Sequence, residues 1–125
     1  MKTITKEELQ EILEAHKLWI DSGEQEGCRA DLSKVDLSRV DLSWTNLREI
    51  DLSGADLSWT DLTGADLTGA NLSGAYLQEA NLQGAYLSKT DLRVATAKGC
   101  VIYRAEFSSP KDRARLLMLG AREEW

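Results

Sequence analysis

Residues 65–74 read Ala-Asp-Leu-Thr-Gly-Ala-Asn-Leu-Ser-Gly, which is one five-residue unit written twice. The unit continues in both directions without a gap and covers residues 30–109 in 16 repeats. Leucine stands at the centre of 13 consecutive units, from Leu32 to Leu92, and Ala97, Ile102 and Phe107 continue the register. A small or β-branched residue comes two positions before each central residue, usually with Asp or Asn between them. A repeat of this regularity has to be explained before any single residue is interpreted.

A period of five fits neither standard element. On an α-helix each step of five residues turns the side chain by about 140°, and on a strand an odd step reverses its direction. Within one unit, however, the small residue and the leucine are two positions apart and share a face. If the chain turns at the next two residues, which are mostly Ser, Thr, Gly or charged, every unit presents its apolar pair to one interior. The sequence therefore predicts a coil stacked around its own apolar axis, with each small residue, Ala95 and Cys100 included, pointing inward.

The Ala-(Asp/Asn)-Leu-x-x unit resembles the pentapeptide-repeat family. The resemblance implies an all-β solenoid, a right-handed quadrilateral β-helix with four units in each coil. The four coils would then be residues 30–49, 50–69, 70–89 and 90–109. Residues twenty apart would lie in columns along the axis, for example Leu32, Leu52, Leu72 and Leu92.

The sequence on either side of the repeats predicts a capping α-helix at each end, because an open coil exposes backbone groups and apolar surface. Thr5 and Glu8 form a capping-box pattern before an amphipathic stretch that ends at residue 21, and Ser109-Pro110 is a helix start. We therefore divide the chain into an N-terminal capping helix and turn (1–29), a β-helix (30–109) and a C-terminal helix (110–125). Four consecutive apolar residues are a candidate cap or homodimer surface: Leu116, Leu117, Met118 and Leu119.

Charge and hydropathy exclude several classes of function. The 15 Lys and Arg residues against 21 Asp and Glu give a net charge of −6, which argues against direct nucleic-acid binding. The longest apolar runs, residues 100–103 and 116–119, are far too short to span a bilayer. The first residues are charged and lack the apolar segment of a secretion signal, so we expect a cytoplasmic protein that binds no membrane.

No residue pattern points to catalysis. His16 has no second histidine with which to share a metal, so we interpret it as a structural residue. Cys28 and Cys100 lie too far apart for a disulfide or a zinc site and are expected to be reduced. The repeat aspartates invite an interpretation as acids or Ca²⁺ ligands, but they occur on every side and are better explained as solubilising groups that bond local turn amides. We predict no catalytic, cofactor or metal site, and hence a protein that is not an enzyme.

Trp44 and Trp59 form, with Tyr76, a candidate interaction surface. Both tryptophans stand at corner positions on adjoining sides, where most units carry Gly or a charged residue. Exposed aromatic residues on a rigid wall are frequent anchors of protein interfaces. The alternative is that these rings lie flat on the wall or cover a terminal helix.

Two functions are compatible with these observations. The first is a non-enzymatic protein-interaction or scaffold module whose partner is unidentified. The alternative comes from the resemblance, because some pentapeptide-repeat proteins inhibit or protect DNA gyrase or a related topoisomerase by mimicking duplex DNA. Four coils spaced by about 4.8 Å would form a stack roughly 20 Å tall. A DNA duplex of that length carries about 12 negative charges, whereas the repeats hold 11 acidic and 7 basic residues, a net charge of −4. This arithmetic favours the interaction module, although a coaxial dimer would double the length.

Overall fold

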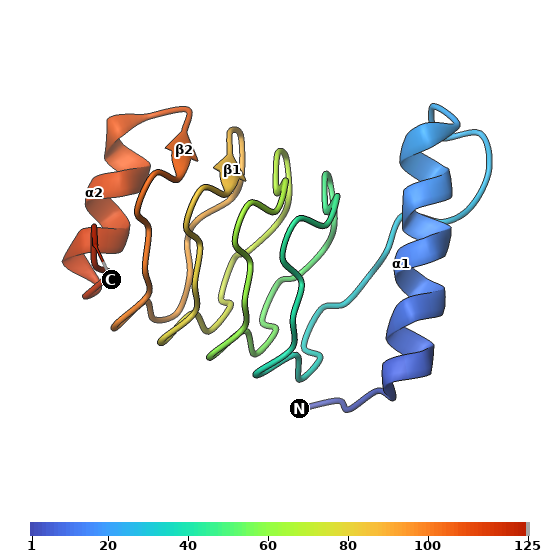
Figure 1. Ribbon diagram of the computed structural model, residues 1–125, viewed down its shortest axis with the longest axis horizontal. Coiled ribbons are helices and arrows are strands. Elements are labelled where there is room, and N and C mark those ends of the chain that lie inside the picture. The colour runs from blue at the N-terminus through green and yellow to red at the C-terminus, as the bar shows by residue number, and fades with distance from the viewer. Residues whose placement is uncertain (125) are drawn as a thin grey trace.

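The repeats stack into a solenoid in the computed structural model, which describes residues 1–124 (Figure 1). The element order is α1 (Lys6–Asp21), β1 (Tyr86–Leu87), β2 (Glu106–Phe107) and α2 (Pro110–Met118). Strands β1 and β2 pair in parallel with Tyr86 opposite Glu106. The other repeats form single parallel bridges, each between residues twenty apart, such as Asp41 with Asp61 and Asp61 with Asn81. Each side of a coil is thus too short for a longer strand, but the sides pair in register along the whole axis.

Three backbone hydrogen bonds in a typical repeat join one coil to the next, two along the side and one at the corner, such as that from Gly64 N–H to the carbonyl of Gln83 (2.8 Å). In a typical pair, the N–H of Leu62 donates to the carbonyl of Asn81 (2.8 Å), and the N–H of Asn81 donates back to the carbonyl of Thr60 (3.0 Å). Because this pattern recurs around the coil, most backbone polar groups are satisfied by neighbouring coils, while the N–H of the small residue closes the corner turn within its own coil, as Ala65 N–H does with the carbonyl of Leu62 (3.0 Å). The ladder explains why a single coil would not be stable alone.

The interior of the solenoid is formed by the repeat leucines, and this prediction is confirmed. All 13 are at most 2% exposed. Thr60 and Thr90 occupy buried small-residue positions, where their hydroxyls donate to the carbonyls of Leu37 (2.8 Å) and Leu67 (2.7 Å). The few polar groups that enter the core are therefore hydrogen-bonded, as a buried hydroxyl requires.

The repeat aspartates shape the corners. Asp61 Oδ1, for example, accepts hydrogen bonds from the backbone N–H (3.0 Å) and the hydroxyl (2.6 Å) of Thr63. The next residue in most units has a positive φ, from Lys34 (58°) in the first coil to Arg104 (59°) in the last. Glycine adopts this left-handed conformation without strain, which explains its frequency at the second corner position.

Ala95 is an exception, and the prediction that it points inward is wrong. Ala95 is exposed, whereas the preceding Val94 is buried (8% exposed). Val94 stands where the other units need a positive φ, a conformation that a β-branched residue strongly disfavours. The corner is therefore built differently: Ala95 N–H, instead of Thr96 N–H, donates to the carbonyl of Ala75 (2.8 Å). The regular register returns at Ala97, which is fully buried.

Helices α1 and α2 lie at opposite ends of the solenoid (Figure 1). Thr5 caps α1 in a capping box with Glu8, and Ser109 caps α2 with Pro110 in its first turn, as the sequence predicts. Each chain terminus adds one bridge to the ladder, Lys2 with Val35 and Arg122 with Val101. Neither helix within residues 1–124 is long and apolar enough to cross a membrane.

Candidate interaction surface

Corner positions hold the two candidate tryptophans. Arg39 and Trp59 are twenty residues apart and share one corner column, and Trp44 stands at the following corner of the first coil. The side that carries Asp41 and Asp61 lies between these two columns. We call Trp44, Trp59 and Tyr76 the aromatic wall.

Trp44 lies against the corner of the next coil. It has a φ of 60°, and a Cβ added to Gly64 would come within 2.3 Å of its ring carbons. One part of the ring therefore covers Gly64, which is buried, in agreement with the interpretation that the ring lies on the wall. The residue nevertheless remains 76% exposed.

Trp59 packs with a cation. The Arg39 guanidinium carbon lies 5.3 Å from the centroid of the Trp59 ring, a distance typical of a cation–π contact. Trp59 is still 53% exposed. In the same column, the carboxylate of Glu79 lies over Gly99. This corner therefore presents a basic, an aromatic and an acidic side chain in sequence along the axis.

Tyr76 occupies an Asp-type position and points outward. It is 38% exposed and bridges Asp56 and Thr96. It lies near Trp59 in the neighbouring coil, because the Trp59 N–H donates to the carbonyl of Gln78, two residues beyond Tyr76. Tyr86, which is outside the predicted surface, is a second exposed tyrosine (47%) at the equivalent position of another side. The signal was available, since both tyrosines replace the acidic residue of an Ala-x-Leu unit.

The four apolar residues near the C-terminus separate into two pairs. Leu116 is fully buried and Leu117 partly buried, so both pack against the end of the solenoid. Met118 is 88% exposed and Leu119 is 36% exposed. These two border a shallow pocket with basic residues, namely Arg93, Lys111 and Arg115.

His16 anchors α1 to the first coil. The ring is fully buried; its Nδ1 accepts from Ala30 N–H (2.9 Å), and its Nε2 donates to the carbonyl of Arg48 (2.8 Å). Burial lowers the pKa of His16, which keeps the ring neutral as these two bonds require. Both ring nitrogens are used, which leaves neither for a metal ion or a proton transfer.

The two thiols and the repeat carboxylates have distinct surroundings. Burial raises the pKa of the Cys100 thiol to about 12, so it remains protonated, and Cys28 is exposed and unpaired with it. Within residues 1–124 no three His, Cys, Asp or Glu side chains are grouped so that they could hold a metal ion. Hydrogen bonds from Ser33, Ser38 and Ser43 lower the pKa values of Asp31, Asp36 and Asp41 respectively. These outward carboxylates are therefore ionised turn formers.

Comparisons with known proteins agree with this geometry. A family model for pentapeptide repeats, in 8 copies, matches residues 28–54 and 55–93. A pentapeptide repeat protein from the thylakoid lumen of Arabidopsis thaliana is similar in structure (TM-score 0.55, 25% identity), over 75% of this chain and 80% of its own. QnrB1, a plasmid-mediated fluoroquinolone resistance protein, shares the fold (TM-score 0.58, 23% identity) over 70% of this chain but only 41% of QnrB1.

A search of curated proteins found no match. The family model alone covers more than half of the chain, and the observed bridges between residues twenty apart are those of a four-sided coil. The chain therefore belongs to the pentapeptide-repeat family and forms its right-handed quadrilateral β-helix.

Proposed function

We propose that the protein is a non-enzymatic interaction or scaffold module whose aromatic wall binds a protein partner. In this proposal residues 30–109 form a rigid scaffold of four coils, and residues 1–29 and 110–125 cap its ends. The observation that carries it is the exposure of Trp44 (76%) and Trp59 (53%) at two corners of the wall. Large exposed aromatic side chains are over-represented among the residues that contribute most to protein–protein binding.

The backbone under both tryptophans is already fixed. Trp44 N–H donates to the carbonyl of Thr63 (2.8 Å), and Trp59 N–H donates to that of Gln78 (3.1 Å). A partner that packs on these rings therefore orders side chains only, which reduces the entropic cost of binding. The positive φ of both tryptophans belongs to the corner position and not to the aromatic side chain, since Lys34 and Lys89 share it at the same position of their units.

The test removes the indole rings of Trp44 and Trp59 and keeps the backbone of both corners. The double variant Trp44→Ser with Trp59→Ser is compared with the control Lys34→Ser with Lys89→Ser in a pull-down from the native host, followed by binding to the purified partner. We expect the tryptophan variant to lose at least about tenfold in affinity while the control binds normally. Unchanged binding would exclude the tryptophans as the binding surface, and a collapse of the melting temperature of the tryptophan variant would show that the rings are structural.

A contact between two copies through Met118 and Leu119 is a further part of this proposal, because these residues expose apolar surface at the end of α2. Light scattering of the full chain at high concentration should give the mass of a dimer, and Met118→Asp should reduce it to that of a monomer. A point substitution is preferable to removal of the helix, since Leu116 is fully buried and its loss would open the core. A monomeric wild-type chain would exclude this contact.

Mimicry of duplex DNA toward a topoisomerase is the second candidate, and the arrangement of the aspartates supports it. The first two coils pair outward aspartates directly along the axis, Asp31 with Asp51, Asp36 with Asp56 and Asp41 with Asp61. The bridged strands that carry these aspartates lie about 4.8 Å apart on three sides of the coil.

This candidate predicts that the purified protein changes DNA supercoiling by gyrase. Replacing Asp51, Asp61 and Asp66 by Asn should weaken the effect, because Asn71 and Asn81 show that asparagine preserves the turn bond without the charge. A protein with no effect on gyrase would exclude mimicry.

A further inference from the structure

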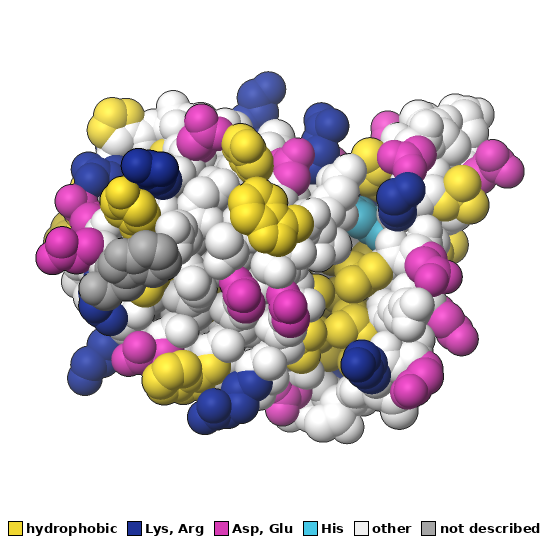
Figure 2. All heavy atoms as spheres, in the orientation of Figure 1, with side chains coloured by type: hydrophobic (Ala, Val, Ile, Leu, Met, Phe, Trp, Pro, Cys, Tyr) yellow, Lys and Arg dark blue, Asp and Glu magenta, His cyan; other side chains and the backbone are white. Residues whose placement is uncertain are grey.

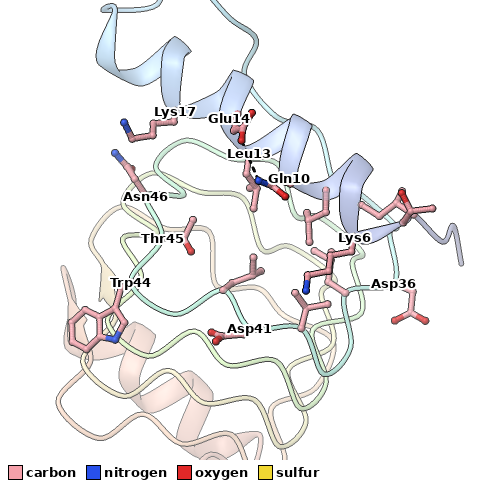
Figure 3. A pocket seen from close by; sticks show the side chains of 16 residues that line it. Lys6, Gln10, Leu13, Glu14, Lys17, Asp36, Asp41, Trp44, Thr45 and Asn46 are labelled. Atoms are coloured by element: carbon pink, nitrogen blue, oxygen red, sulfur yellow. Dashed lines mark hydrogen bonds between the residues drawn. The ribbon is translucent and has the colours of Figure 1, made fainter.

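A groove of about 800 Å³ separates α1 from the first coil. Its apolar lining comes from Ile4, Leu9 and Leu13 on one side and from Leu37, Val40 and Leu42 on the other. Figure 2 shows this lining as a hydrophobic hollow between the helix and the body of the solenoid. Figure 3 shows Leu13 on α1 and Asp41 on the coil on either side of the groove, with Gln10 hydrogen-bonded to Glu14 along the helix. The volume falls in the range of about 300–1,000 Å³ typical of ligand sites.

The coil edge that borders this groove has unused backbone groups. Further down the same side, Asp61 N–H donates to the carbonyl of Val40 (3.0 Å), and Leu42 N–H donates to the carbonyl of Asp61 (2.8 Å). Asp41 is the equivalent residue of the first coil, and neither its N–H nor its C=O has a partner within residues 1–124. The groove therefore contains an open position of a parallel ladder at Asp41, directly beside apolar surface, and the backbone of Asn46 at its far border is unpaired in the same way within residues 1–124.

The molecule itself shows that the ladder accepts added strands. On the neighbouring side of the first coil, Lys2 N–H donates to the carbonyl of Lys34 (3.0 Å), and Asp36 N–H donates to that of Lys2 (2.7 Å). Ile4, two residues on, packs against the core. The chain then leaves the ladder at Thr5 to begin α1, so the open position at Asp41 is the next one that a continued strand would fill.

The same column is closed at its other end. Arg122 bridges Val101, which lies in the column of Asp41, Asp61 and Asn81. Ile102 N–H donates to the carbonyl of Arg122 (2.8 Å) and Arg122 N–H donates to that of Cys100 (2.6 Å). A short segment outside the repeats thus already completes this side of the solenoid at one end.

The geometry of a coil side defines the chemistry of the missing segment. Of three consecutive extended residues, the first and third point inward and the second points outward. The inward positions would face Leu13, Val40 and Leu42, which favour aliphatic side chains. The outward position would stand next to the carboxylate of Asp41 and above that of Asp61, which favours Lys or Arg as the cross-strand neighbour.

We propose that the groove binds an extended peptide segment of the pattern aliphatic–basic–aliphatic, which adds as a parallel strand to the Asp41 edge of the first coil. The first aliphatic residue accepts a hydrogen bond from Asp41 N–H, and the amide of the second aliphatic residue donates to the Asp41 carbonyl. Strand addition of this kind gives affinity through the main chain and specificity through alternate side chains. The groove shares Trp44 with the aromatic wall but is bordered by neither Trp59 nor Tyr76, so Trp59→Ser separates this site from the function proposed for the wall.

The binding test uses the full chain and a labelled, capped peptide of sequence Gly-Ser-Val-Arg-Leu-Ser-Gly, followed by fluorescence anisotropy. We expect saturable binding that weakens by at least about tenfold when the Leu amide is N-methylated, because that amide donates to Asp41. N-methylation of the Arg amide is the matched control and should have little effect, since that N–H points away from the coil. Amide exchange of Asp41 should slow when the peptide is bound.

Variants of the protein test the two halves of the site. Leu13→Glu should weaken binding at least about tenfold, whereas Leu18→Glu, on the same helix but outside the groove, should not. Asp41→Asn should reduce affinity for the Arg peptide but not for a peptide with Gln in its place, and Asp51→Asn is its control. Trp59→Ser should leave peptide binding unchanged.

Three results would overturn the proposal. Absence of peptide binding would exclude the site. Equal affinity for the peptide N-methylated at Leu would show that the groove takes an apolar ligand without strand addition. A dimer of the full chain that Leu13→Glu dissociates would identify the occupant as a second copy.

Discussion

The two ends of the solenoid are finished in different ways. At the C-terminal end Leu116 is fully buried and the segment around Arg122 bonds to the last coil through Cys100 and Ile102. At the N-terminal end α1 is held by His16, but Leu13 is only partly buried and the edge at Asp41 is open within residues 1–124. One helix therefore closes the core by packing, and the other is held at His16, at the buried Leu9 and by the Lys2 bridge that precedes it, but leaves a groove. This difference shows that covering the end of a β-helix does not require that its whole ladder be paired.

The largest expected effect comes from deleting one leucine side chain at each end. Leu116→Ala removes a fully buried side chain and should lower the free energy of unfolding by about 2–5 kcal/mol. Leu13→Ala removes a side chain that already faces the groove and should cost about 1 kcal/mol or less. Urea unfolding of both variants measures the difference. Equal losses would show that the N-terminal end is as tightly packed as the C-terminal one.

Mild acid should loosen only the N-terminal end. The pKa of His16 is lowered in the folded protein by burial, so the unfolded state binds more protons once the pH falls below the ordinary histidine pKa of about 6.5. Stability that is complete above that pH is then lost as the pH falls toward the folded pKa, by at most about 1.4 kcal/mol per pH unit.

The measurement is urea unfolding between pH 7.5 and pH 5. The aspartates do not titrate in this interval, because their pKa values are lowered in the folded protein and their contribution to the free energy of unfolding is lost only below about pH 4. Exchange of amides around Ala30 should accelerate over the same range, whereas exchange of Ile102 should not. His16→Gln should remove most of the pH dependence. A wild-type slope retained in this variant would assign the effect to another group.

Much of this fold can be predicted from the sequence because the repeat is a local rule. The spacing of Leu57 or Leu82 alone indicates an inward side chain, and both are fully buried. The wrong prediction for Ala95 has the same origin, because the repeat period takes no account of the unfavourable left-handed conformation that Val94 would need at its corner. The groove depends on the distance between α1 and the first coil, which is set by tertiary contacts such as that of His16 with Arg48. No periodicity in the sequence encodes that distance.

The smallest expected effect distinguishes two glycines of one corner column. Gly64 and Gly84 have almost identical φ values, +66° and +67°, so replacement by Ala should cost both about 1 kcal/mol of conformational strain. A Cβ on Gly84 meets nothing within 4 Å, whereas one on Gly64 would collide with the ring of Trp44. Since the ring is a mobile side chain, it should move rather than unfold the coil. Gly64→Ala should therefore match Gly84→Ala in stability but shift the indole N–H resonance of Trp44, which Gly84→Ala should not.

Movement of the Trp44 ring in Gly64→Ala also tests the aromatic wall. If the ring leaves the corner, Trp44 becomes more exposed than 76% without any change to the residue itself. A partner that recognises the ring where it now lies should bind Gly64→Ala more weakly than Gly84→Ala, although both variants keep every aromatic residue. An unmoved Trp44 resonance in Gly64→Ala would mean that the ring does not rest on this corner in solution. The wall would then be a set of mobile side chains, and its preorganisation could not contribute to binding.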